Sequence, residues 1–161
     1  MVFIPRIFDT DQHVIPPKEM WTSRMPKRLA DVAPKVVETP DGGEAWSFGG
    51  GAYLHLFGLQ NVEGKDPATF SWRGRYDEIG AGCYDAQARL TSMDIDGVGA
   101  TLLFPSGGEY AANTQDEELC YESCKAYNDG MWDWAQDGDP KRMFPAALIP
   151  SIGVKLATAE L

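Results

Sequence analysis

Histidine, cysteine and positive charge are all scarce in this sequence. Its 161 residues include 2 His and 3 Cys, and 14 Lys and Arg stand against 24 Asp and Glu, for a net charge of −10. An acidic surface repels phosphate backbones and no basic run offsets it, so we expect no nucleic-acid partner. The cysteines are odd in number and match no zinc spacing, which predicts reduced thiols.

Long hydrophobic runs are also missing. No apolar stretch reaches the ~18 residues that a membrane-spanning helix needs, so no membrane partner is expected. The first residues lack the pattern of a signal peptide, and together with the reduced thiols this predicts a cytoplasmic protein. With 43% hydrophobic residues, the chain has enough apolar surface for one globular domain with its own core.

Proline and glycine divide the chain into two regions. Residues 14–80 are interrupted by both, including the run Gly49–Gly51, and this predicts long loops with short elements. An irregular insertion of this length usually has a function or covers something. Residues 84–161 follow a regular pattern of helices and strands instead.

The regular region opens with a helix and a strand. Asp85 predicts the start of a helix that carries Ala86, Leu90 and Met93 on one face and ends at Gly97. The apolar run 98–104 then ends at Pro105. Its lack of alternation predicts a strand that is buried on both faces, as in a parallel sheet.

The next helix has the clearest signals. Thr114 and Glu117 form a capping-box pattern, and Gly138 with Pro140 predicts the end of the helix. Spacings of four and three define an apolar stripe of Cys120, Cys124, Tyr127, Met131 and Trp134. The two cysteines are interpreted as small core residues rather than as redox or metal groups.

A strand at 143–149 and a helix from 154 to 161 complete the pattern. With a first strand at 3–8, the chain contains about three βα units. The predicted fold class is α/β: a partial (β/α)8 barrel of about the first three units, with a loop-rich insertion (14–80) after the first strand. A closed barrel needs eight units and about 250 residues, so 1–161 is interpreted as the N-terminal part of one barrel domain.

Three polar side chains follow the first apolar run. Asp9, Asp11 and His13 would share one face of a strand, because side chains alternate with period two. At the carboxyl end of a barrel strand that face points into the mouth of the active site. Carboxylate and imidazole donors suit zinc or a similar divalent ion, although a short polar cluster can also serve only as a hydrogen-bonding loop.

Two other features are given structural interpretations. His55 lies between apolar neighbours, which favours a hydrogen-bonded core histidine over a metal ligand. The glycine run 49–51 has no following Lys-Ser/Thr and opens no helix, which favours a plain turn over a phosphate-binding loop.

Several blocks of the sequence resemble one known family. They are Asp9-x-Asp11-x-His13 followed by 14–21, then 33–38, 84–90, 93–98, 103–106, 126–129 and 147–150. In this order they resemble the amidohydrolase-related metal-dependent hydrolases, in the branch with aminocarboxymuconate-semialdehyde decarboxylase and the dihydroxybenzoate decarboxylases. The resemblance implies a (β/α)8 barrel that binds one divalent metal.

The resemblance also implies site residues. Asp11 and His13 match the first two metal ligands, at the end of strand one. Zinc is the expected ion, with manganese or magnesium as alternatives, since a carboxylate replaces one imidazole. The family's other ligands and its catalytic histidine lie on later strands, so the catalytic residues stay unassigned and this chain alone is expected to be inactive.

The functional hypothesis follows from these residues. The chain is interpreted as the N-terminal fragment of a hydrolase or decarboxylase (a lyase) acting on a small carboxylated or cyclic substrate, with a homo-oligomer possible for the full-length parent. Arg24, Arg73 and Arg75 could bind a substrate carboxylate, and the alternative is solvated surface charge. The competing hypothesis is a non-catalytic truncated fragment or interaction module that needs a partner chain.

Overall fold

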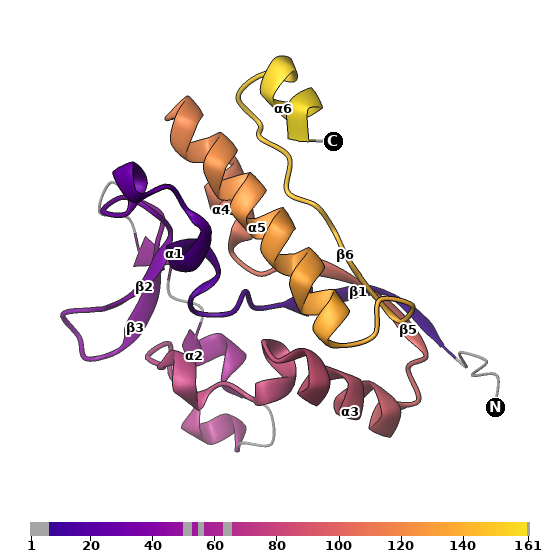
Figure 1. Ribbon diagram of the computed structural model, residues 1–161. Helices are drawn as coiled ribbons and strands as arrows, with labels where there is room; N and C mark the ends of the chain where they lie inside the picture. Colours follow the sequence, from indigo (N-terminus) through magenta and orange to yellow (C-terminus); the bar gives the residue numbers. More distant parts are fainter. Residues whose placement is uncertain (1–6, 50–52, 55–56, 63–65, 161) are drawn as a thin grey trace.

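Two small sheets organise the computed structural model, which describes residues 7–49, 53–54, 57–62 and 66–160 (Figure 1). A parallel sheet has the strand order β1-β5-β6, and an antiparallel sheet has the order β2-β3-β4. The parallel sheet comprises β1 (Phe8–Val14), β5 (Ala100–Pro105) and β6 (Met143–Pro145). The antiparallel sheet comprises β2 (Lys35–Glu38), β3 (Glu44–Ser47) and β4 (Tyr53–Leu54). The fold is therefore mixed α/β.

The helices join and cover these sheets. They are α1 (Met20–Arg24), α2 (Phe57–Gln60), α3 (Ala86–Asp96), α4 (Gly108–Ala112), α5 (Glu117–Asp137) and α6 (Val154–Glu160). Short 3-10 turns lie at Lys27–Leu29, Pro67–Thr69, Tyr76–Glu78 and Ala81–Cys83. In Figure 1 the long helix α5 runs across the parallel sheet, with α3 beside it. Within the described ranges, no helix combines the length and apolar character needed to cross a membrane.

The two faces of the parallel sheet differ in burial. Cross-strand partners share a face, and the pair Thr101 and Met143 is at most 1% exposed, as is Leu103. On the opposite face Phe8, Phe104 and Phe144 are 53%, 37% and 40% exposed. The prediction that the strand in 98–104 is buried on both faces is therefore wrong at Phe104. The reason is that the described residues place helices over one face only.

The face with the three phenylalanines is called the open face below. The register places Leu102 beside Phe144, and His13 beside Phe104, on this side of the sheet. The rings of Phe8 and Phe144 lie 6.0 Å apart across it. A parallel sheet normally has both faces covered, so the open face is an unusual exposure of apolar surface.

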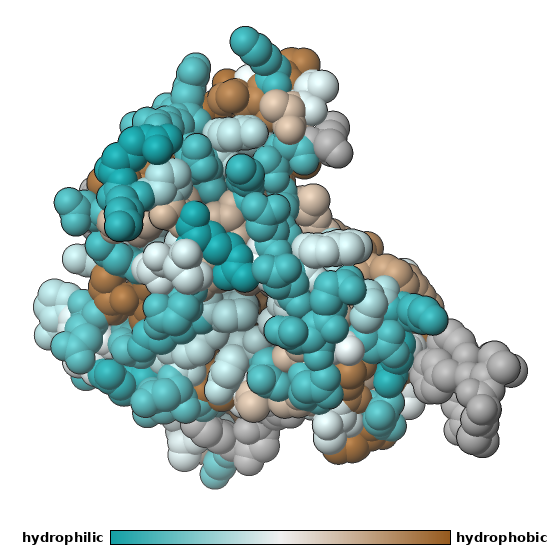
Figure 2. Space-filling view, viewed as in Figure 1, coloured by the Kyte–Doolittle hydropathy of each residue, from teal (hydrophilic) through white to brown (hydrophobic). Residues whose placement is uncertain are grey.

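Figure 2 shows the side of the molecule that carries α5. Hydrophilic residues cover most of it, and the hydrophobic ones are scattered in small patches. This distribution agrees with an acidic helix that buries one stripe. Cys120, Cys124 and Tyr127 are fully buried, and Met131 and Trp134 are at most 6% exposed, which confirms the predicted stripe.

The helix starts follow their capping residues. The Asp85 carboxylate accepts a hydrogen bond from Ala88 N at 2.8 Å, and Gly97, with a φ of +71°, ends α3 as predicted. The predicted capping box of Thr114 and Glu117 is wrong. The cap of α5 is Asp116, which accepts from Leu119 N at 2.8 Å, because Thr114 still belongs to the turn that follows α4.

Two predicted strands have different bounds. The first strand is β1 at Phe8–Val14 rather than 3–8, of which 3–6 lie outside the described residues; backbone pairing with β5 holds the polar segment extended. The strand predicted at 143–149 ends at Pro145. The Asn128 side chain binds both the N–H and the carbonyl oxygen of Leu148, at 2.8 and 2.9 Å, so that stretch of backbone is satisfied without a sheet.

The insertion between β1 and α3 has a core of its own. Trp21, Trp46, Phe57 and Tyr76 are nearly fully buried and meet edge to face, with the centroids of Trp21 and Trp46 5.2 Å apart. Backbone joins this core to the end of β1, where Ile15 N donates to the Cys83 carbonyl oxygen at 2.9 Å. The region predicted as loops therefore packs as a second layer beyond the carboxyl end of β1.

Two glycines allow two segments of the insertion to cross in contact. A Cβ on Gly58 would overlap the carbonyl oxygen of Ser71, and a Cβ on Gly74 would lie 2.5 Å from Gly58 N. Neither obstacle is a flexible side chain, so neither can move aside without displacing backbone. The crossing thus depends on the missing side chains of these two residues.

Gly58→Ala is expected to destabilise the protein by about 3 kcal/mol, the upper end of the usual overpacking cost, because backbone must shift. Gly153→Ala is the matched control, since a Cβ there meets nothing within 4 Å. Thermal unfolding followed by circular dichroism measures both. Equal melting temperatures for the two variants would contradict the role given to the crossing.

Candidate functional site

The carboxyl end of β1 presents the two residues that the sequence singled out. Asp11 Oδ1 and His13 Nε2 lie 4.0 Å apart, and their side chains are 83% and 61% exposed. This contact shows that the two side chains project to the same side of β1. His13 is the cross-strand partner of Phe104, which places this pair at the edge of the open face.

A serine on the neighbouring strand end orients the imidazole. Ser106 follows β5, and its Oγ lies 3.4 Å from His13 Nδ1. Its backbone N–H donates to the carbonyl oxygen of Val14 at 2.9 Å, which fixes the two strand ends together. With Nδ1 facing Ser106, Nε2 is the ring nitrogen turned toward Asp11. Sequence reasoning missed Ser106, although its place directly after an apolar strand was an available signal.

The pair fits part of a divalent metal site. At bond lengths of 2.0–2.1 Å, two ligands on a tetrahedral ion stand about 3.3 Å apart, so a small side-chain rotation closes the 4.0 Å gap. A carboxylate oxygen and an imidazole nitrogen held by a second partner are suitable donors. Across the described ranges, no cluster of three His, Cys, Asp or Glu residues forms. These residues therefore supply two ligands.

Asp9 takes a different role from the one its spacing suggested. The register of β1 against β5 shifts between Asp9 and Gln12, which places one extra residue in β1. Asp9 accepts hydrogen bonds from Asp11 N at 3.1 Å and from Gln12 Nε2 at 2.9 Å. Its carboxylate therefore stabilises the bulge, and the prediction of one shared face for Asp9, Asp11 and His13 fails at Asp9.

The cysteine interpretation is consistent with the burial of these residues. The three cysteines are free, and Cys120 and Cys124 are fully buried on α5. Burial, followed by the neighbouring Cys120, raises the pKa of Cys124 to about 12, so the thiol stays protonated and unreactive. His55 and the glycines 50–51 lie outside the described residues, while Gly49 has a φ of +83°, as in a turn.

The three candidate arginines do not gather in one cluster. Arg24, at the end of α1, contacts Asp133 of α5 at 3.0 Å. Arg73 Nε lies 3.4 Å from Asp41, in the turn between β2 and β3. Arg75 contacts Glu44 instead. Each guanidinium already has a carboxylate partner, so their role in substrate binding stays a prediction.

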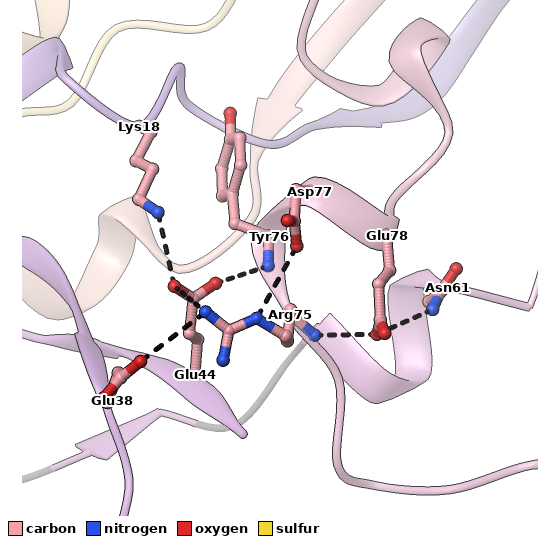
Figure 3. A network of polar contacts seen from close by, with 8 residues as sticks. All are labelled: Lys18, Glu38, Glu44, Asn61, Arg75, Tyr76, Asp77 and Glu78. Atoms are coloured by element: carbon pink, nitrogen blue, oxygen red, sulfur yellow. Dashed lines mark hydrogen bonds and ion pairs between the residues drawn. The ribbon is translucent and has the colours of Figure 1, made fainter. Parts of the chain in front are cut away.

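Arg75 belongs to a network centred on a buried carboxylate (Figure 3). Glu44, on β3, is 7% exposed, and its oxygens lie 3.3 Å from both Lys18 Nζ and Arg75 Nη2. Tyr76 N donates to the same carboxylate at 2.8 Å. Lys18 comes from the segment after β1, so the network joins that segment to the antiparallel sheet and to the 3-10 turn at 76–78.

The network determines the ionisation of Glu44. Burial alone would raise the pKa of Glu44, but the hydrogen bond from Tyr76 and the positive charges of Lys18 and Arg75 outweigh it. The pKa therefore lies below its usual value of 4.5. Burial also raises the pKa of Tyr76, whose hydroxyl donates to the Pro16 carbonyl oxygen at 3.1 Å. Both groups thus hold the segment after β1 in place at neutral pH.

Comparison with known proteins gives one kind of match. No family model and no curated protein matches the chain. Among solved structures, an amidohydrolase from Mycobacterium avium subsp. paratuberculosis K-10 is similar, with a TM-score of 0.70 and 17% identity. The match covers 99% of this chain and 46% of that one. The chain thus has an amidohydrolase-like fold and spans about half the length of that protein.

Acid should destabilise the fold through Glu44. Because folding lowers its pKa, the stabilisation is present above about pH 4.5 and is lost as the pH falls through the pKa of the folded state. We expect Glu44→Gln to cost about 1–2 kcal/mol at pH 7 and to flatten the dependence of the melting temperature on pH below 4.5.

Glu38→Gln is the control for this prediction. Glu38 lies 3.6 Å from the same guanidinium but is 80% exposed, so its loss should change stability little. Melting temperatures between pH 3 and 7 compare the three proteins. An acid profile that is the same for Glu44→Gln and the wild type would contradict the assignment.

Proposed function

We propose that this chain is the N-terminal part of an amidohydrolase-type, metal-dependent hydrolase or decarboxylase that acts on a small carboxylated or cyclic substrate. The observation that carries the proposal is the position of Asp11 and His13 at the carboxyl end of β1, in an amidohydrolase-like fold. Active sites of parallel α/β folds lie at this end of the sheet.

The residues of the chain would divide the work in the parent as follows. Asp11 and His13 would hold the ion, and the contact of Ser106 with His13 Nδ1 would keep Nε2 turned toward it. A divalent ion, zinc by first choice with manganese or magnesium as alternatives, would supply Lewis-acid chemistry toward a substrate oxygen or a water if bound there. The insertion, anchored by Glu44, packs beyond the carboxyl end of β1 and leaves Asp11 and His13 exposed. Further ligands and a catalytic base would have to come from other polypeptide.

Zinc binding tests the proposal directly. Two ligands leave most of the coordination sphere to water, so calorimetry on the 161-residue chain should show weak binding. His13→Ala and Asp11→Asn should each lower the affinity about tenfold or more. Asp9→Asn is the matched control, because this carboxylate serves the bulge, and it should leave binding unchanged. Tight, stoichiometric binding that survives His13→Ala would show that the zinc site is elsewhere.

A second candidate function is an interaction module whose open face is covered by another polypeptide. The exposure of Phe8, Phe104 and Phe144 on one face of a parallel sheet favours it. β1 and β6 are the end strands of that sheet, and edge strands can accept a further strand. The two candidates are compatible, since polypeptide that covers this face could also bring the missing ligands.

The double variant Phe8→Ser/Phe144→Ser should bind a hydrophobic dye less strongly and associate less with other copies of the chain. Ile95→Ser is the control, because Ile95 is 80% exposed on α3, away from the open face. Dye fluorescence and sedimentation velocity measure both effects. If Ile95→Ser reduces dye binding and self-association as much as the double variant does, the open face is not the surface responsible for them.

A further inference from the structure

A cavity lies in the insertion, apart from Asp11 and His13. Its volume is about 600 Å³, within the range of small-molecule sites. The described residues of its walls lie within 58–62 and 66–73, and neither Asp11, His13 nor Ser106 is among them. The residues that matter for its chemistry are Asn61, Asp66, Thr69, Phe70, Ser71 and Arg73.

The crossing of the two glycine-containing segments supports this cavity. Gly58 lines it, and its Cα lies against the backbone of Ser71 and Trp72. Backbone contacts of this kind hold the two walls at a constant separation. The 3-10 turn at Pro67–Thr69 adds a third fixed element, because Asp66 Oδ1 accepts from Ala68 N at 2.9 Å.

Two opposite charges line the cavity without pairing with each other. Arg73 contacts Asp41 through Nε, and among the described residues its two terminal nitrogens have no partner. Asp66 uses Oδ1 for the turn, and within the same ranges its Oδ2 has none. The terminal nitrogens of Arg73 are therefore available on one wall, and Asp66 Oδ2 is available on another. The ring of Phe70 and the side chains of Val62 and Pro67 supply apolar surface.

We propose that this cavity binds a zwitterionic amino acid with an apolar side chain. Arg73 would take the ligand carboxylate through its two terminal nitrogens, since a guanidinium matches a carboxylate in a bidentate arrangement. Asp66 Oδ2 would accept from the ammonium group, and the apolar side chain would lie on Phe70. The inference does not depend on the proposed function, because it uses none of the residues at the end of β1.

The charges of the cavity disfavour simpler ligands. An anion alone would meet Asp66 and a protein of net charge −10, and a cation alone would meet Arg73. A neutral apolar ligand would cover Asp66 Oδ2 and the terminal nitrogens of Arg73 without giving either a partner, which is costly. A ligand that carries both charged groups on one carbon would pair with both walls and add no net charge.

L-Phenylalanine is the probe for the first experiment. Trp72 lies in edge-to-face contact with Phe70, at 5.2 Å between centroids, so binding should change tryptophan fluorescence. Trp72→Phe should remove the change while calorimetry still detects binding. N-acetyl-L-phenylalanine lacks the ammonium charge and L-phenylalaninamide lacks the carboxylate. Each should bind about tenfold more weakly than L-phenylalanine.

Two variants test the charged residues of the cavity walls. Arg73→Gln should weaken binding of L-phenylalanine about tenfold, and Asp66→Asn should do the same while keeping an oxygen that can cap the turn. Arg28→Gln is the matched control, because it also removes one exposed arginine. Arg28 is ion-paired with Glu118 of α5 and does not line the cavity. It should bind like the wild type, and circular dichroism checks that all variants fold.

The ligand series keeps the test decisive even if a variant does not fold. Equal affinities for the zwitterion and its two blocked forms would overturn the proposal, as would no binding at millimolar L-phenylalanine. Zinc binding at Asp11 and His13 is measured separately, so failure at one site leaves the result at the other intact.

Discussion

The pairing of β1 with β5 is the constraint on which the candidate site depends. Its register sets His13 beside Phe104, and the next backbone contact joins Ser106 N to the Val14 carbonyl oxygen. Residues 93 positions apart in sequence thereby meet at 3.4 Å, between Ser106 Oγ and His13 Nδ1. The same pairing holds the polar segment of β1 extended, because backbone hydrogen bonds between strands form whether the side chains are polar or apolar. A bulge between Asp9 and Gln12 precedes His13, whose side chain contacts Asp11 near the carboxyl end of the strand.

The insertion is the second structural unit, and electrostatics attach it to the first. Glu44 is buried with two cations and a backbone N–H around it, so its charge is compensated at the junction between the segment after β1 and the antiparallel sheet. Loss of such a partner would leave neighbouring charges uncompensated in a partly dry space. The aromatic core of Trp21, Trp46 and Tyr76 supplies the apolar part of the same junction.

The contrast between the two faces of the parallel sheet connects fold and function. Helices bury one face, while the open face carries apolar rings together with the two metal-capable side chains. The similar amidohydrolase is about twice as long as this chain. Polypeptide that covered the open face would both bury the phenylalanines and surround Asp11 and His13. The exposed rings and the two metal-capable side chains thus lie on the same side of the sheet.

Local rules were enough for much of the regular half of the chain. Asp85 and Gly97 bound α3 because capping depends on adjacent backbone, and the α5 stripe follows from helical spacing. Two candidate ligands at alternate positions could likewise be identified from residue type and period. The sequence could not show that Asp116 caps α5, because the competing α4 was not recognised.

Tertiary structure decided the features that need distant partners. The end of β6 depends on Asn128 binding Leu148, the ionisation of Glu44 depends on Lys18 and Arg75, and Ser106 becomes part of the site only through β5. Residue types and short spacings thus determined α3 and α5 and singled out the two candidate ligands. Burial, strand register and charge compensation arise from contacts between segments far apart in the chain, and for that reason only the folded structure could determine them.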